Sequence, residues 1–203
     1  VRRRRRHRMS ADQRDDHVPG RHDLGPAVER FDDVVDRGLE RFRGNPAIDR
    51  VFTTASHVGD FSLIWHVINV LIGIRRRETK QTVTFAILIG LESLVVNQGV
   101  KRLFRRTRPT TAGDDRLAVR RPRTSSFPSG HASSATFACA MLAPRTGNPA
   151  TALVCLVAST VATSRAYVRI HHASDVVAGV VTGAVLAAVT RRVIRRLGRA
   201  DLL

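Results

Sequence analysis

The sequence predicts an all-α, membrane-embedded helical bundle. Two features predict the helices, and the placement in a membrane rests on these features together with the motifs described below. Apolar residues gather in five segments between Phe61 and Val193, whereas the residues before Phe61 and the connecting loops hold most of the charge. An amphipathic stretch precedes the apolar segments. With 203 residues the chain is long enough for one domain. We expect a basic, polar and disordered tail at 1–23, amphipathic interfacial helices at 24–58, and a helical domain at 59–198.

The amphipathic stretch predicts one helix over 26–43 and a shorter helix after it. Pro26 suits a first helical position, and Gly44 suits a stop. Apolar side chains recur on one face and charged side chains cover the other, so this helix should lie on a surface of the bundle or of a membrane. Asn45-Pro46 has the pattern of a cap and first turn. Two starts for the chain remain open, Val1 and Met9, and the basic tail receives no catalytic role.

Five apolar segments predict the helices of the bundle, at residues 61–74, 82–100, 131–143, 150–163 and 174–189. The second is long enough to cross about 30 Å of hydrocarbon at about 1.5 Å per residue. Several others are shorter, so hydropathy alone fits a buried bundle as well as a membrane bundle. Gly, Ala, Ser and Thr in the last three segments permit close helix packing in either setting. Glu92 is costly at membrane depth, so we expect it either to meet a partner in the bundle or to line a substrate groove, and we favour the packing role.

The formal net charge of +17 indicates an anionic partner. Nucleic acid, an anionic membrane surface and a phosphorylated substrate all satisfy this requirement. Charge alone therefore does not choose among them, and the choice depends on residues that can carry chemistry.

Three short clusters at the ends of the predicted helices stand out. They are Lys101 to Arg108-Pro109, then Pro128-Ser129-Gly130-His131, and finally Ser164-Arg165 with His171 and Asp175. If the helices alternate in direction, all three clusters meet at one end of the bundle, and Arg75–Arg77, Arg145 and the C-terminal arginines lie at the opposite end. Separate charged motifs that converge in this way are what an active site on a bundle requires.

The residue types in these clusters suit phosphoryl transfer. That reaction spreads negative charge over three oxygens, and Lys101, Arg108 and Arg165 can supply fixed positive charge. Ser129 and Gly130 open a helix, where free backbone N–H groups and the helix dipole favour an anion. Gly130 allows close backbone approach, and the Ser129 hydroxyl can donate a hydrogen bond.

Two histidines and one carboxylate complete the predicted chemistry. His171 and Asp175 are four residues apart and hence adjacent on one helical face, provided that the last helix starts this early. The carboxylate would then fix the tautomer of His171 and leave its other nitrogen free to attack phosphorus. His131 comes from another helix, where it can protonate the leaving oxygen and then deprotonate water.

Together the clusters resemble the signature of the type 2 phosphatidic acid phosphatase family, which includes vanadium haloperoxidases and class A bacterial acid phosphatases. The first motif is Lys, six residues, Arg-Pro. The second is Pro-Ser-Gly-His, and the third is Ser-Arg, five residues, His, three residues, Asp. Every signature position has its counterpart in this chain, and the resemblance covers roughly residues 60–190.

This resemblance implies a metal-independent phosphoric ester hydrolase that cleaves a lipid phosphate monoester or pyrophosphate through a phosphohistidine intermediate. His171 would be the nucleophile, His131 the acid and base, and Asp175 the partner of His171. Phosphate would be bound by Lys101, Arg108, Ser129, Gly130 and Arg165. The resemblance implies no cofactor, and no segment has metal-ligand spacing. We expect an integral protein of the cell membrane with a phosphorylated lipid substrate. Family members in membranes typically have six spanning helices, one more than the apolar segments found here.

Two alternatives stay open. A vanadium-dependent haloperoxidase-like enzyme would use the same residues to hold vanadate, although those enzymes are soluble and usually larger. A basic, non-enzymatic nucleic-acid-binding protein would explain the charge. It would not explain His131, His171 and Asp175, and no nucleic-acid partner is expected. The arginines outside the signature are interpreted as a solvated face: Arg102, Arg105, Arg106, Arg120, Arg121 and Arg123.

Overall fold

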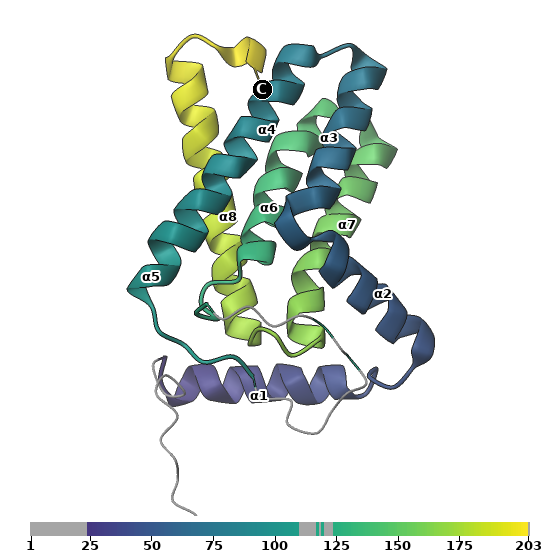
Figure 1. The fold of residues 1–203 in the computed structure, drawn as a ribbon, viewed down its shortest axis with the longest axis vertical. Helices are drawn as coiled ribbons and strands as arrows, with labels where there is room; N and C mark the ends of the chain where they lie inside the picture. Colours follow the sequence, from purple (N-terminus) through teal and green to yellow (C-terminus); the bar gives the residue numbers. More distant parts are fainter. Residues whose placement is uncertain (1–23, 110–116, 118, 120–123, 203) are drawn as a thin grey trace, which may run out of the picture.

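The computed structural model describes residues 24–109, 117, 119 and 124–202, and this part of the chain is helical without a strand. The predicted tail at 1–23 and the arginines at 120, 121 and 123 lie outside the described residues. The elements, in chain order (Figure 1), are α1 (Pro26–Glu40), α2 (Pro46–Val58), a 3-10 turn (Asp60–Ser62), α3 (Leu63–Arg76), α4 (Thr79–Leu94), a π-helical turn (Val95–Val100), α5 (Lys101–Leu103), α6 (Gly130–Leu142), a 3-10 turn (Ala143–Arg145), α7 (Asn148–Tyr167), α8 (Ala173–Arg196) and a final 3-10 turn (Ala200–Leu202).

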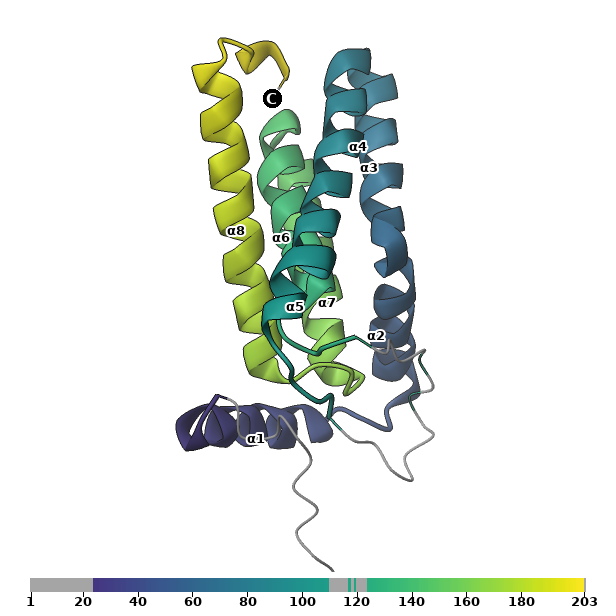
Figure 2. The same cartoon turned by 60° about the vertical axis from the view of Figure 1, so that its left-hand side comes forward.

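Helices α3, α4, α6, α7 and α8 run side by side as a bundle, and α1 lies across its lower end (Figures 1 and 2). All five correspond to the predicted apolar segments, so the all-α prediction is confirmed. The short helix α6 is the centre of the bundle, because most of its residues are buried. It packs between α7 and α8 and also contacts α4.

Small residues allow α8 to lie unusually close to α6. A Cβ atom on Gly179 would lie 2.4 Å from the carbonyl oxygen of Ser129, and one on Gly183 would lie 2.2 Å from that of Ser133. Real Cβ atoms essentially never come so near. Glycine at these two positions is therefore a packing requirement, as in other close helix pairs of membrane bundles.

Among the residues that the structure describes, three helical stretches are long and apolar enough to cross a membrane: Thr79–Leu103, Pro149–Tyr167 and Ala173–Arg196. A fourth crossing is possible if α2 and α3, which meet at an angle of 68°, form one bent span. The long helices expose large apolar side chains, as a lipid-facing surface does: Ile87, Leu91, Leu153, Leu156, Val177 and Val181. By contrast, α6 has only 13 residues and is enclosed by its neighbours, which is why hydropathy alone could not classify it.

Helix α1 begins at Pro26 as predicted and ends at Glu40, three residues before the predicted end, and only part of its apolar face is buried. Asn45 caps α2 through its side-chain oxygen, as expected, and Leu39 packs on the buried residues Tyr167 and Ile170. However, Phe31 and Val34 are exposed, whereas Asp32 from the charged face is buried. Asp32 is therefore an exception on the charged face, because buried hydrogen-bond donors lie opposite this side chain.

Candidate active site

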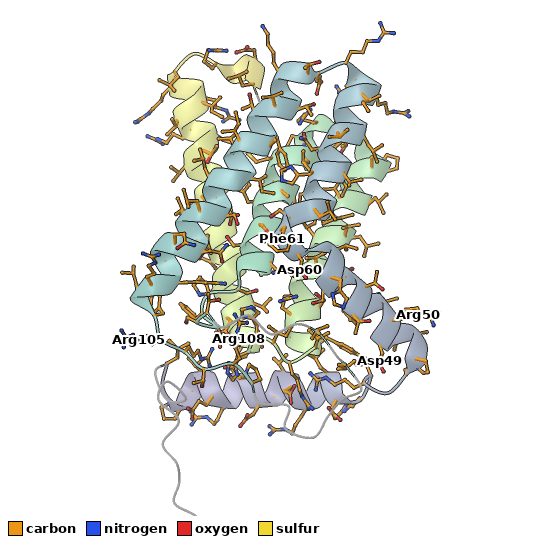
Figure 3. All side chains as sticks on the ribbon, viewed as in Figure 1. Asp49, Arg50, Asp60, Phe61, Arg105 and Arg108 are labelled. Carbon is orange, nitrogen blue, oxygen red and sulfur yellow. The ribbon has the colours of Figure 1, made fainter. Side chains whose placement is uncertain are left out.

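The structure brings the three sequence clusters to the end of the bundle that α1 covers. Lys101 begins α5, the Pro-Ser-Gly-His segment enters α6, and the third cluster links α7 to α8. Figure 3 shows Arg108 between this end of the bundle and α1, with Asp60 at the junction of α2 and α3. The end of α3, where three consecutive arginines stand at 75–77, lies at the opposite end with the connection to α4 (Figures 1 and 2).

The first part of the site is the start of α6. Ser129 is the N-cap of this helix, and its hydroxyl oxygen accepts the backbone N–H of Ala132. A Cβ atom on Gly130 would lie 3.5 Å from Nζ of Lys101 and 3.1 Å from Oδ1 of Asn97. A Cβ atom would thus be tight only against Asn97, and the Lys101 ammonium group lies beside the backbone N–H groups of the helix start. Helix dipole, N–H donors and ammonium together form a cradle for an anion.

Arg165 adds a second cation, held by α2. Its Nη1 donates to the carbonyl oxygen of Ser56 at 3.3 Å and also to the Ser56 hydroxyl. Within the part of the chain that the structure describes, its Nε is buried without a hydrogen-bond partner. A buried N–H without a partner is costly, so this donor is available to an incoming anion.

Arg108 lies directly beside His171. Its Nη1 is 3.1 Å from Nε2 of the imidazole and donates to the carbonyl oxygen of Ile170 at 3.0 Å. Burial lowers the pKa of Arg108 to about 10, which leaves the guanidinium charged at neutral pH. Burial also lowers the pKa of His171 to about 3 against the opposing effect of the nearby Asp175 carboxylate, and the Arg108 charge adds to the lowering. His171 is therefore neutral, the form in which imidazole nitrogen is a nucleophile.

Asp175 meets His171, but not along one helical face as the spacing predicted. Helix α8 begins at Ala173, two residues after His171, so the pairing runs around the N-cap residue His172. Asp175 Oδ2 accepts the backbone N–H of His172 at 2.9 Å and lies 3.6 Å from His171 Nδ1. Among the described residues, His171 Nδ1 has no hydrogen-bond partner. The carboxylate is thus poised against the ring nitrogen at slightly more than hydrogen-bond distance.

Arg106 is buried, which corrects its interpretation as part of a solvated face; Arg102 and Arg105 are exposed, as expected. Its two terminal nitrogens donate to Asp175 Oδ1 at 2.6 Å and to Asp32 Oδ2 at 2.7 Å. Two carboxylates in a buried position stabilise the guanidinium there. The sequence carries no signal for this contact, because Arg106 stands among four other basic residues between Lys101 and Pro109.

His131 is held by a carboxylate that sequence reasoning missed. Its Nε2 lies 2.9 Å from Oδ1 of Asp60, in the short turn before α3. A Cβ atom on the neighbouring Gly59 would lie 2.8 Å from the imidazole ring, so glycine is needed for this approach. With the Nε2 proton directed to Asp60, Nδ1 is the nitrogen left for proton exchange with a substrate.

Two hollows adjoin the site. A cavity of about 460 Å³ lies between α1 and the connection from α7 to α8, and His171 and His172 are among its lining residues. A groove of about 390 Å³ lies between α3 and α4 and ends at Asn97, next to the anion cradle.

Glu92 lies deeper in the bundle and accepts a hydrogen bond from the Ser133 hydroxyl. Glu92 thus has the bundle partner expected of a packing residue.

The described residues contain no group of three or more His, Cys, Asp or Glu side chains that could hold a metal ion. The charges that face the presumed position of an anion come from Lys101, Arg108 and Arg165. An all-α membrane bundle with such a cluster beside a neutral histidine has the architecture of an integral membrane phosphatase.

Comparison with known proteins gives the same class. Residues 81–199 match the model of the PAP2 superfamily. The chain is 33% identical over 139 residues to decaprenylphosphoryl-5-phosphoribose phosphatase of Mycolicibacterium smegmatis, covering 67% of this chain and 73% of that protein. The protein of the same name from Mycobacterium tuberculosis is 33% identical over 126 residues, which cover 61% of this chain and 68% of that one.

Two solved structures share the fold. The transmembrane PAP2-type phosphatidylglycerolphosphate phosphatase of Bacillus subtilis superposes with a TM-score of 0.66 at 22% identity, covering 86% of this chain and 89% of that one. LpxE of Aquifex aeolicus superposes with a TM-score of 0.65 at 20% identity, covering 85% and 99%. The chain belongs to the PAP2 superfamily, and it is a membrane phosphatase.

Proposed function

We propose that this protein hydrolyses a lipid phosphate monoester or pyrophosphate at the cell membrane, without a metal ion, through a phosphohistidine intermediate on His171. The observation that carries the proposal is the neutral His171, whose Nε2 lies 3.1 Å from a charged arginine and whose Nδ1 lies 3.6 Å from Asp175. A nucleophile, a cation for the phosphoryl oxygens and an orienting carboxylate are the parts that this chemistry needs.

In the first step, the substrate phosphate occupies the cradle at the start of α6 and draws hydrogen bonds from Lys101, Arg165 and Arg108. Arg108 now donates to Nε2 of His171, and a phosphate that competes for this guanidinium frees the lone pair on Nε2. That lone pair attacks phosphorus as the bond to the leaving oxygen breaks. The positive charge that develops on the ring is stabilised by Asp175.

His131 handles the protons in both steps. Protonated His131 donates a proton to the leaving oxygen in the first step, and the neutral ring then removes a proton from the water that attacks the phosphohistidine. Asp60, at 2.9 Å, orients the ring and stabilises its protonated form. Inorganic phosphate is one product. The other is an alcohol from a phosphate monoester or a monophosphate from a pyrophosphate.

The likeness to phosphatases named for decaprenylphosphoryl-5-phosphoribose makes a polyprenyl-phospho-sugar phosphate the first substrate to test. Phosphatidic acid, phosphatidylglycerol phosphate and polyprenyl phosphates or pyrophosphates complete the panel. Purified protein in detergent should release phosphate from at least one of them, and His171→Ala protein should not. EDTA should leave the rate unchanged, and vanadate should inhibit. Loss of activity in EDTA with recovery in magnesium would refute the metal-independent mechanism.

A further inference from the structure

Arg106 lies between two carboxylates that come from distant parts of the chain. Its Nη1 donates to Asp175 Oδ1 at 2.6 Å and to the Ser174 hydroxyl at 2.7 Å, while Nη2 donates to Asp32 Oδ2 at 2.7 Å. The Arg106 and Asp32 side chains are 4% and 7% exposed, and Asp175 is fully enclosed. Desolvated charges with such short contacts hold a fixed geometry.

Asp32 also binds the start of α8 directly. Its Oδ1 accepts the backbone N–H of Ser174 at 2.7 Å, and its Oδ2 accepts the Ser174 hydroxyl at 2.8 Å. The first N–H groups of a helix lack partners within the helix, and an acidic group there is favourable for the dipole. A carboxylate from α1 thus serves as a cap for the helix that carries Asp175.

These contacts fix the carboxylate that faces the nucleophile. Arg106 holds Oδ1 of Asp175, and the backbone N–H of His172 holds Oδ2, the oxygen that faces His171. The plane of the carboxylate is therefore set from both sides. Charge matters as well, because one guanidinium shared between two carboxylates leaves a net negative charge opposite His171. With Asp32 neutral, Arg106 would cancel the charge of Asp175 alone, and the imidazolium formed during phosphoryl transfer would lose stabilisation.

We propose that Asp32 and Arg106 are positioning residues of the phosphatase, and that α1, through Asp32, is a working part of the active site. The proposal rests on the function proposed for His171. Helix α1 lies outside the residues that match the superfamily model, which begin at 81. Asp32 lies outside the three signature motifs, and Arg106 occupies one of the six unspecified positions of the first motif. Their contribution should therefore appear in the chemical step and not in phosphate binding.

The test compares Asp32→Asn with a matched variant on the same helix, Asp36→Asn. Asp36 forms ion pairs with Arg43 at 2.7 Å and with Arg169 at 3.0 Å, so it also fastens α1 to the bundle. Within the described part of the chain, Asp36 pairs with Arg43 and Arg169 and not with Arg106 or the start of α8. Asp32→Asn keeps the shape of the side chain and one oxygen that can still accept from Ser174. Its NH2 group cannot accept the hydrogen bond from Arg106, and the negative charge is lost. The pair of variants separates the docking of α1 from the support of Asp175.

Asp32→Asn should lower kcat about tenfold or more, since small displacements in an active site are costly. KM and the inhibition constant of inorganic phosphate should change less than about twofold, because the phosphate cradle is intact. Asp36→Asn should keep kcat within about twofold, and Asp32→Glu should restore part of the loss. In an Asp175→Asn background, Asp32→Asn should cause no further loss, because its target is already absent.

Equal kcat values for Asp32→Asn and Asp36→Asn would overturn the proposal. It would also be overturned if Asp32→Asn lowered kcat by the same factor in the Asp175→Asn background as in the wild type. Thermal unfolding of each variant identifies global destabilisation. If Asp32→Asn fails to fold, the kcat of Asp32→Glu is compared with that of Asp36→Asn instead. An active wild-type protein with unaffected Asp32 variants refutes this inference alone. A wild-type protein that releases no phosphate from any substrate refutes the proposed function and this inference with it.

Discussion

The contact between α8 and α6 predicts that Gly179→Ala damages catalysis although Gly179 belongs to no catalytic motif. A Cβ atom there would lie 2.4 Å from the carbonyl oxygen of Ser129 and 2.9 Å from Cβ of Ala132, whereas ordinary contacts begin at 3.4 Å. The start of α6 must therefore move by about 1 Å, because both neighbours are rigid parts of a closely packed helix. Overpacking of this kind costs about 1–3 kcal/mol.

The displaced residues are the anion cradle itself, so the loss of activity should exceed the loss of stability. A misplacement of about 1 Å can cost about a hundredfold in rate, and we expect kcat/KM of Gly179→Ala to fall by about that factor. Phosphate release in detergent measures the activity, and thermal unfolding measures the stability.

Two glycine variants serve as controls for this prediction. Gly73→Ala meets Thr82 Oγ1 at 2.0 Å at the far end of the bundle, and Gly90→Ala meets nothing within 4 Å. Gly73→Ala should destabilise without a specific loss of turnover, and Gly90→Ala should resemble the wild type. If Gly179→Ala keeps as much activity as Gly73→Ala at equal stability, the start of α6 does not position the phosphate.

Three further predictions concern the histidines. His171→Ala should remove nearly all turnover while folding is retained, and more than about a tenth of wild-type activity would exclude His171 as the nucleophile. His131→Ala should lose more activity on a lipid phosphate than on p-nitrophenyl phosphate, whose leaving group barely needs a proton; equal losses without a burst of p-nitrophenol would remove the acid role. The pKa of His171 is about 3 in the folded protein and about 6.5 in an unfolded chain. Between these two pH values the imidazole binds a proton only in the unfolded state, so the stability of the folded protein falls as the pH drops from 6.5 towards 3. On going from pH 7 to pH 5 the wild type should lose up to about 2 kcal/mol more than His171→Gln, and equal losses in thermal or denaturant unfolding would show that His171 is not held neutral.

The helices were predictable because their signals are local. Pro26, Gly44 and Asn45 mark helix ends by their own backbone chemistry, and apolar segments mark the bundle. The position of the three motifs at helix ends, together with alternating helix direction, was enough to place them at one end of the bundle. The residues that bind phosphate in the proposed mechanism therefore came from local patterns.

The supporting residues were not predictable, because their partners are distant in the sequence. Arg106 contacts Asp32 and Asp175 across 74 and 69 residues, and His131 contacts Asp60 across 71. A buried arginine and a solvated arginine look alike in a basic stretch. The spacing of His171 and Asp175 also misled, because a pair four residues apart implies one helical face only when both residues are in the helix.

The stereochemical course at phosphorus tests the central claim most directly. Each in-line displacement inverts the configuration, so transfer to His171 followed by transfer to water should give overall retention. The measurement uses a thiophosphate substrate whose phosphorus atom is chiral through oxygen isotopes. The wild-type protein hydrolyses it in water that carries a third oxygen isotope, and the configuration of the product distinguishes retention from inversion. Retention is the predicted result. Inversion would mean that water attacks the substrate directly and that no phosphohistidine forms.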